Sequence, residues 1–421
     1  MEQRQEQQEN KKKTVRMIAQ CLCKMHSFTR ADFPLPDGGS SPLKAITCHC
    51  NSCRHVSGCM SGSRALLWND DEPDMFSDAD MESSSGRLRV YKYSESMTLV
   101  FCGRCSSPLF ARDAGSSPAQ KVKLWVCTGV LMKHNIKLEV DWGYQVFVGD
   151  TVDGGVSNWL KGKRWLGAGG KSEEVKEEGE YWPAVESDEG KKVGDMKGEF
   201  PGNVRLKCHC GGVDFLVKAG EAQREFEEQA KKGEEKLPWF VDEVTHKSLG
   251  TLDGCDSCRV WSGVEVMNWT FALLKHIGFG DGSEGFPADT RALKAAVGED
   301  YNTHPEEGDK FGTLAYYASS PDVQRYFCSR CAACVFYCVD DRPEQVDVAV
   351  GLLHAQEGAR AERMISWEFG GQISFREDMA GTWRENLLDT VERESEEWRV
   401  KRGYPMSWRR TAKEAADGNS Q

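Results

Sequence analysis

Cysteine is the residue type in this chain whose number and spacing point most clearly to chemistry. The 421 residues include 17 cysteines, and most of these fall in short clusters. In the first half the clusters read C-x-C, then C-x-C-x-x-C, then C-x-x-C, formed by Cys21, Cys23, Cys48, Cys50, Cys53, Cys102 and Cys105. Residues two apart on a strand face the same side, and a C-x-x-C turn approaches an ion from another direction, so two such pairs can complete a tetrahedral zinc site.

These seven thiols can be divided between two ions in more than one way. One assignment puts the two outer pairs on a structural zinc and leaves the central three, Cys48, Cys50 and Cys53, on an open zinc. A closed four-cysteine site is structural, whereas three protein ligands and a free fourth position are typical of catalytic zinc. The alternative joins the central three to one outer pair and leaves the other pair without an ion. His49 or His55 could also close the central site as a fourth ligand, which would make that site structural.

Three ordered motifs of the first half recur in the second half. Cys21-x-Cys23 recurs as Cys208-x-Cys210 (187 residues later), Cys53-Arg54 as Cys258-Arg259 (205 later), and the pattern of residues 86–110 as that of 312–336 (226 later). Offsets that grow stepwise predict a duplicated framework whose second copy carries longer surface loops between the motifs. The chain is therefore predicted to hold two tandem copies of one domain.

The second copy favours the division into four and three. Its outer thiols all persist as Cys208, Cys210, Cys328 and Cys331, but its central cluster reads Asp253-x-Cys255-x-x-Cys258. The outer four thus behave as one unit and the central three as another. A carboxylate is a harder metal ligand than a thiolate, so we expect the second site, formed by Asp253, Cys255 and Cys258, to be less active than a site of three thiolates. Asp253 fits the role of an N-cap or turn residue as well as it fits that of a ligand.

Short runs rich in β-branched and aromatic residues surround these motifs. They are RLRVYKY, TLVFC, KLWVCTGV and YQVFVGD in the first copy, and RYFC, CVFYCV and VDVAVGLL in the second. Such runs predict strands, and helical spacing or composition predicts added helices over 221–236 and 382–400. We therefore expect a mainly β chain with two mostly antiparallel domains and added helices. Tyr91 and Tyr317 are expected to be core aromatics.

Composition shifts mark the expected domain boundaries. Residues 1–16 are almost wholly polar, and residues 171–200 hold ten acidic and five basic residues with little apolar periodicity. The predicted organisation is a disordered N-terminus (1–16), a first zinc domain (17–162), an acidic linker (163–201), a second zinc domain (202–378) and a helical C-terminal tail (379–421).

Charge and hydropathy narrow the classes of partner and compartment. The net charge of −12 opposes nucleic acid as the main partner. No apolar run approaches the roughly 18 residues that a membrane helix needs, and the polar N-terminus does not look like a secretory signal. We therefore expect no membrane partner and a cytoplasmic location, with the nucleus as the alternative. In such a reducing compartment, cysteines hold metal or do catalysis more often than they form disulfides.

The cysteine order resembles that of a known family. The sequence C-x-C, CHCxxCRxxSG, GxLxxYxxS and FCxxC is similar to the signature of the glutathione-dependent formaldehyde-activating enzymes, a family that includes the centromere protein V domain. The resemblance spans residues 17–162 and, with departures, 202–378. Tandem copies joined by an acidic linker are similar to uncharacterised fungal members. Lys24 and Ser106 stand where the family usually has glycine, and Asp253 departs from it in the second copy.

This resemblance implies a β-tent fold with zinc as its cofactor. The implied sites are two structural zinc ions on the outer cysteine pairs and one or two open zinc ions on the central clusters. The implied activity is that of a carbon–sulfur lyase, the reversible addition of glutathione to formaldehyde that gives S-hydroxymethylglutathione. Cys48, Cys50 and Cys53 are then the candidate catalytic zinc ligands, with a small thiol such as glutathione as substrate. The competing hypothesis is a non-catalytic zinc scaffold whose added helices bind a protein partner.

Overall fold

The computed structural model describes residues 14–34, 43–68, 88–115, 122–132, 140–175, 201–233, 236–298 and 310–418. Of the segments expected to be disordered or linker, residues 1–13 and 176–200 lie outside these described residues. The chain is mainly β, as predicted, and most strand pairs are antiparallel. Among the described helices, none combines the length and apolar character that a bilayer span requires.

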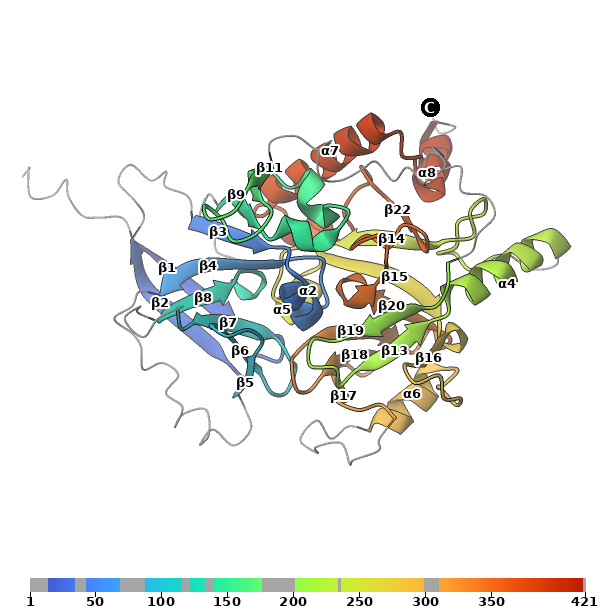
Figure 1. Cartoon of the computed structure of the whole chain (residues 1–421), viewed down its shortest axis with the longest axis horizontal. Helices are drawn as coiled ribbons and strands as arrows, with labels where there is room; N and C mark the ends of the chain where they lie inside the picture. The colour runs from blue at the N-terminus through green and yellow to red at the C-terminus, as the bar shows by residue number, and fades with distance from the viewer. Residues whose placement is uncertain are drawn as a thin grey trace, which may run out of the picture.

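Two large sheets, one from each half of the chain, form the framework (Figure 1). The N-terminal half (residues 14–175) forms a nine-stranded sheet in the order β11 (Glu174–Val175), β10 (Lys163–Trp165), β9 (Val140–Val146), β3 (Leu43–Cys48), β4 (Gly62–Trp68), β8 (Lys123–Cys127), β7 (Pro108–Asp113), β6 (Met97–Cys102) and β5 (Leu88–Lys92). The C-terminal half (201–418) forms a seven-stranded sheet in the order β22 (Ile365–Trp367), β14 (Ser248–Asp253), β15 (Met267–Leu273), β20 (Gln345–Ala349), β19 (Cys334–Val339), β18 (Val323–Cys328) and β17 (Leu314–Ser320). The strands from β9 to β5 and the strands from β22 to β17 occur in the same relative chain order across their sheets. The first pair of this run is parallel in both sheets, β9 with β3 and β22 with β14.

Smaller sheets carry the first cysteine pair of each half. The N-terminal half has a hairpin of β1 (Thr14–Gln20) and β2 (Ser27–Pro34). The C-terminal half has a four-stranded sheet in the order β16 (Ile277–Phe279), β13 (Asp214–Val217), β12 (Val204–Lys207) and β21 (Leu353–His354). Two strands, β10 and β11, lie within residues 163–175, so ordered structure extends past the boundary predicted at 162.

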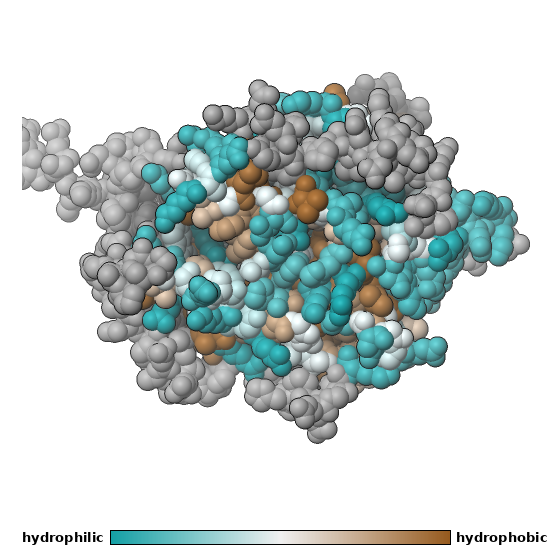
Figure 2. Space-filling view, viewed as in Figure 1, coloured by the Kyte–Doolittle hydropathy of each residue, from teal (hydrophilic) through white to brown (hydrophobic). Residues whose placement is uncertain are grey.

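Six α-helices accompany the sheets in the part of the chain that the structure describes. They are α2 (Asn51–Ser57), α4 (Ala219–Lys232), α5 (Asp256–Ser262), α6 (Thr290–Val297), α7 (Glu385–Arg402) and α8 (Trp408–Gly418). The helices predicted over 221–236 and 382–400 are confirmed as α4 and α7. Figure 1 shows α4 projecting from the C-terminal half, and Figure 2 shows that its outer surface is hydrophilic. In contrast α7 buries Leu387, Leu388, Val391 and Trp398.

The two halves share one hydrophobic core. Buried residues of both sheets and of α7 form a single cluster. Two backbone hydrogen bonds cross between the halves in corresponding places: Gly129 N–H donates to the Gly263 carbonyl at 3.0 Å, and Gly351 N–H donates to the Gly58 carbonyl at 2.9 Å. Gly58 and Gly263 end α2 and α5, the helices that follow the central cysteine clusters. The association of the halves therefore fixes the ends of the helices that carry the candidate sites.

Candidate metal centres

The structure brings the outer cysteines of each half together as the spacing suggested. Each C-x-C pair lies in the turn of a hairpin, between β1 and β2 or between β12 and β13, and each C-x-x-C lies between the strands of a second hairpin, β6–β7 or β18–β19. The two groups, whose Sγ atoms lie within 4.8 Å of one another, are Cys21, Cys23, Cys102 and Cys105, and Cys208, Cys210, Cys328 and Cys331. The hairpin turns thus place four thiols around a common point in each half.

The distances within these outer groups fit a four-thiolate zinc site. The Sγ atoms of Cys23 and Cys102 lie 3.6 Å apart, and those of Cys210 and Cys328 lie 3.4 Å apart. Four sulfurs bound to zinc at about 2.3 Å lie about 3.8 Å apart in a tetrahedron. Backbone N–H groups also point at the sulfurs, such as that of Val213 at 3.2 Å from Cys208 Sγ. Such donors stabilise the thiolate form that binds metal.

The two departures from the glycine pattern keep the backbone conformation that glycine would supply. Lys24 follows the first C-x-C pair with φ +61°, and Gly211 occupies the corresponding place in the C-terminal half with φ +72°. Ser106 and Ala332 follow the C-x-x-C turns with φ +59° and +67°. A left-handed conformation costs a non-glycine residue roughly 1–2 kcal/mol, so the turn geometry is retained at some expense in stability.

The central cluster of the N-terminal half combines a strand end with a helix start. Cys48 ends β3, Cys50 is the N-cap of α2, and Cys53 lies in its first turn, with Cys53 N–H donating to Cys50 Sγ at 3.3 Å. The three Sγ atoms lie within 4.8 Å of one another, and those of Cys48 and Cys50 are 3.4 Å apart. Cys53 is buried, whereas Cys48 and Cys50 are half-buried. The cluster is therefore reachable from the Cys48 and Cys50 side.

An arginine lies against this central cluster. Arg64 on β4 donates from Nη2 to Cys53 Sγ at 3.4 Å. Hydrogen bonds from Cys48 and Cys50, and the positive charge of Arg64, hold the pKa of the Cys53 thiol well below its usual range despite burial. Three thiolates and a divalent cation carry one net negative charge, which the Arg64 guanidinium offsets. Arg64 therefore favours the thiolate form at Cys53, whereas hydrogen bonds to the neighbouring thiols and burial raise the pKa of Cys48.

The central cluster of the C-terminal half has the same backbone plan but different electrostatics. Cys255 is the N-cap of α5, and the Asp253 carboxylate accepts from Cys255 N–H at 2.7 Å and from Cys258 Sγ at 3.5 Å. Asp253 ends β14 and is not the N-cap of α5; its carboxylate accepts a hydrogen bond from the N-cap residue, and it also groups with the two thiols as a possible ligand. The hydrogen bond with Cys255, burial and the Asp253 charge raise the pKa of the Cys258 thiol. This cluster therefore offers two thiols and one carboxylate where the first offers three thiols.

No histidine joins either central cluster among the described residues. The buried His49 bonds through Nε2 to Gln145 Oε1 at 3.0 Å, and burial lowers its pKa to about 4. His55 stacks on His354 with ring centroids 4.2 Å apart, and burial lowers its pKa to about 3. Neither side chain closes the first central cluster as a fourth ligand, so that cluster keeps a free position.

Each outer cluster is covered by a tyrosine from the opposite half. The Tyr91 hydroxyl lies 2.8 Å from Nδ1 of His209, which stands between Cys208 and Cys210, and His209 Nε2 lies 3.2 Å from Ser52 Oγ on α2. Tyr317 lies under the Arg104 guanidinium, 5.6 Å from the ring centroid. These tyrosines are half-buried at the junction of the halves, and are not simple core residues as the sequence suggested.

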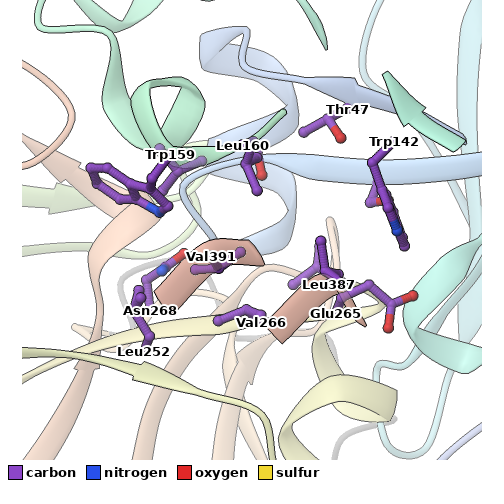
Figure 3. A pocket seen from close by; sticks show the side chains of 14 residues that line it. Thr47, Trp142, Trp159, Leu160, Leu252, Glu265, Val266, Asn268, Leu387 and Val391 are labelled. Carbon is purple, nitrogen blue, oxygen red and sulfur yellow. The ribbon is translucent and has the colours of Figure 1, made fainter. Parts of the chain in front are cut away.

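Two small cavities lie between the halves. The first, of about 20 Å³, is bordered by Cys53, Arg64 and Cys127 and by Gly263 and Val264 of the C-terminal half. The second, of about 50 Å³, is lined by side chains of both halves and of α7 (Figure 3). Each can hold one to a few water-sized molecules. Neither cavity has room for a ligand of the size of a peptide.

The residues that reasoning from the sequence missed come from distant segments. Arg64 lies on β4 and Arg325, which donates to Cys258 Sγ at 3.6 Å, lies on β18. These arginines do not occupy matching positions in the repeat, so the comparison of the halves does not reveal them. Tyr93 and His209, discussed below, likewise approach the first central site only through the fold.

The comparisons with known proteins agree with this geometry for the N-terminal half. No match was found among curated proteins or among solved structures. Residues 16–149, which include all seven clustered cysteines of the N-terminal half and no cysteine of the C-terminal half, match the family model described as glutathione-dependent formaldehyde-activating enzyme.

Proposed function

We propose that this chain is a zinc-dependent carbon–sulfur lyase that acts on S-hydroxymethylglutathione or a related thiol adduct. The reaction site is the central cluster of Cys48, Cys50 and Cys53. The observation that carries this proposal is that three thiols converge there without a fourth side-chain ligand among the described residues, within the segment that matches the family model. The closed four-cysteine groups serve as structural sites.

The residues around the central cluster have separate roles in this proposal. A zinc ion bound by the three thiolates supplies a free position at which a thiol loses its proton more readily and a carbonyl is polarised. Cys48 and Cys50, which are half-buried, form the accessible edge that a thiol substrate meets. Arg64 balances the negative charge that accumulates when a substrate thiolate joins the cluster.

We take the two halves to be tandem copies that have diverged in function. The equal strand order of their large sheets and the matching hydrogen bonds Gly129–Gly263 and Gly351–Gly58 support this interpretation. In the C-terminal copy, the acidic Asp253 replaces one thiol of the central cluster. Chemistry is accordingly assigned to the first copy, and the second copy acts as its structural partner.

The scaffold hypothesis has weaker support. One of the helices that was expected to offer a binding surface, α7, is instead packed into the shared core through Leu388 and Val391, which are 0% and 2% exposed. The other, α4, presents a hydrophilic surface (Figure 2). Neither helix shows an exposed apolar face of the kind that marks a protein-binding site.

The proposal includes a reducing compartment, the cytoplasm or the nucleus, as the place of action. All 17 cysteines are free thiols, and 13 of them with Asp253 form the four clusters. Free clustered thiols suit a compartment in which disulfides do not persist. Glutathione, the proposed thiol substrate, is abundant in such compartments.

Metal content and activity together test this proposal. Protein purified without added zinc is analysed for zinc per chain beside Cys53→Ser and Cys258→Ser, and each form is assayed for its effect on adduct formation from formaldehyde and glutathione. We expect about three zinc ions per chain, a loss of one ion and of activity in Cys53→Ser, and little change in Cys258→Ser. About two ions, insensitive to both substitutions, and no effect on the adduct would refute the lyase assignment and favour a scaffold.

A further inference from the structure

Tyr93 presents an unpaired hydroxyl and packs against Arg64, the arginine that contacts the first central cluster. The side chain is 5% exposed, and among the described residues its hydroxyl has no hydrogen-bond partner. Burial raises the pKa of Tyr93, and the charges of Cys53 and Cys48 add to this effect, so the hydroxyl keeps its proton within electrostatic reach of both sulfurs. A buried hydroxyl without a partner costs stability, and its retention calls for an explanation.

Arg64 connects this tyrosine to the cluster. The Arg64 guanidinium lies 5.3 Å from the centroid of the Tyr93 ring and donates to Cys53 Sγ. Among the described residues Arg64 forms no ion pair with a carboxylate, so sulfurs are its main partners. The cavity of about 20 Å³ beside Cys53 and Arg64 has room for a one-carbon group but not for a peptide.

The corresponding place in the C-terminal half offers no such donors. Ser319 stands where the first half has Tyr93, and its hydroxyl accepts from Arg325 Nε at 3.2 Å. The other Arg325 nitrogens donate to Ser257 Oγ at 2.7 Å and to Cys258 Sγ at 3.6 Å. Each of the three Arg325 nitrogens is therefore engaged by a neighbouring side chain.

We infer that Tyr93 and Arg64 form a subsite beside Cys53 that binds the oxygen of the one-carbon group. This inference rests on the proposed function. When a thiol adds to formaldehyde, the S–C bond forms, the carbonyl π pair becomes an alkoxide pair, and the thiol proton ends on that oxygen. The Tyr93 hydroxyl donates a hydrogen bond to the oxygen as its charge grows, and Arg64 stabilises the same charge. Cleavage of the adduct runs through the same contacts in reverse.

The test compares two ligands that differ by this oxygen. Binding of S-hydroxymethylglutathione, formed by premixing formaldehyde and glutathione, is measured against S-methylglutathione on the zinc-loaded full chain by calorimetry. The variants are Tyr93→Phe and, as matched control, Tyr326→Phe, which also removes a buried, unpaired tyrosine hydroxyl but in the C-terminal half. We expect the wild type and Tyr326→Phe to prefer the hydroxymethyl ligand about tenfold, and Tyr93→Phe, which keeps only the Arg64 contact, to lose most of this preference.

Melting temperature and zinc content supply an independent readout. Because the unpaired hydroxyl contributes no bond to the fold, Tyr93→Phe should keep its zinc and melt no lower than the wild type. A lower melting temperature or lost zinc would assign Tyr93 a structural role and overturn the inference. A preference retained in Tyr93→Phe would also overturn it, while leaving the lyase proposal intact. If the wild type binds neither ligand, the lyase proposal itself fails and the subsite fails with it.

Discussion

Adding one methyl group at Gly129 should weaken the packing of the two halves against each other and lower the stability of the fold. A Cβ at this position would lie 2.4 Å from the backbone of Gly263 and Val264 in the opposite half. The φ of Gly129 is not positive, so the penalty of Gly129→Ala arises from the contact and not from backbone strain. Overpacking against a rigid neighbour costs about 1–3 kcal/mol, and weakening the Gly129–Gly263 hydrogen bond adds about 1 kcal/mol.

The expected loss of about 3 kcal/mol corresponds to a fall in melting temperature of roughly 3–5 °C for a chain of this length that unfolds as one unit. Thermal unfolding of the zinc-loaded chain measures it, with Gly202→Ala as the matched control because a Cβ at Gly202 meets no atom within 4 Å. Gly351→Ala, whose Cβ would lie 2.1 Å from the Cys59 carbonyl oxygen, should behave like Gly129→Ala. Equal melting of Gly129→Ala and Gly202→Ala would refute the packing of the halves, as would two separate unfolding transitions in the wild type.

Three further predictions concern the clusters and the ion pairs. Burial alone would raise the pKa of Glu362, but Arg360 and Arg402 lower it to about 2. The ionised Glu362 carboxylate therefore contributes its full stabilisation of the folded state above pH 4.5, and this contribution is lost as the pH falls towards 2. Glu362→Gln should therefore cost about 3 kcal/mol near pH 7 and progressively less in acid, measured as melting temperature against pH; a constant difference would contradict this. Lys24→Gly should raise the free energy of unfolding by about 1 kcal/mol in denaturant titrations, because Lys24 has φ +61°, and a loss of stability would contradict the strain argument. Cys102→Ser should lose one zinc ion and melt lower, as should the wild type with chelator, whereas Cys334→Ser, which removes a buried thiol outside the clusters, should keep all its zinc.

Local sequence patterns predicted the parts of this fold that depend on neighbouring residues. Strand composition located β5, β6, β18 and β19, and the C-x-C and C-x-x-C spacings located the turns that carry the outer thiols. Periodicity located α7, because its apolar residues recur at helical spacing and are buried. In contrast β10 and β11 were missed: they are three and two residues long, and strands this short leave no alternation to detect.

The contacts between the halves could not be predicted in the same way. They join residues more than 100 positions apart, such as Tyr91 with His209 and Arg259 with the Gly129 carbonyl. Each of these residues has an ordinary local explanation as a core aromatic, a loop histidine or a helix cation. Their roles follow only once the common core of the two halves is known.

These contacts also explain how a second copy with a weakened central cluster can remain necessary to the first. His209 is held between Cys208 and Cys210, and it contacts both the Tyr91 hydroxyl and Ser52 on α2. Ser52 lies between Cys50 and Cys53, and Tyr93 follows Tyr91 by two residues at the end of β5. If the outer cysteines of the C-terminal half bind an ion, as we propose, that ion would order a histidine that contacts both the helix and the strand of the first central site. Loss of that ion should disturb the first site, even though all three of its thiols remain in place.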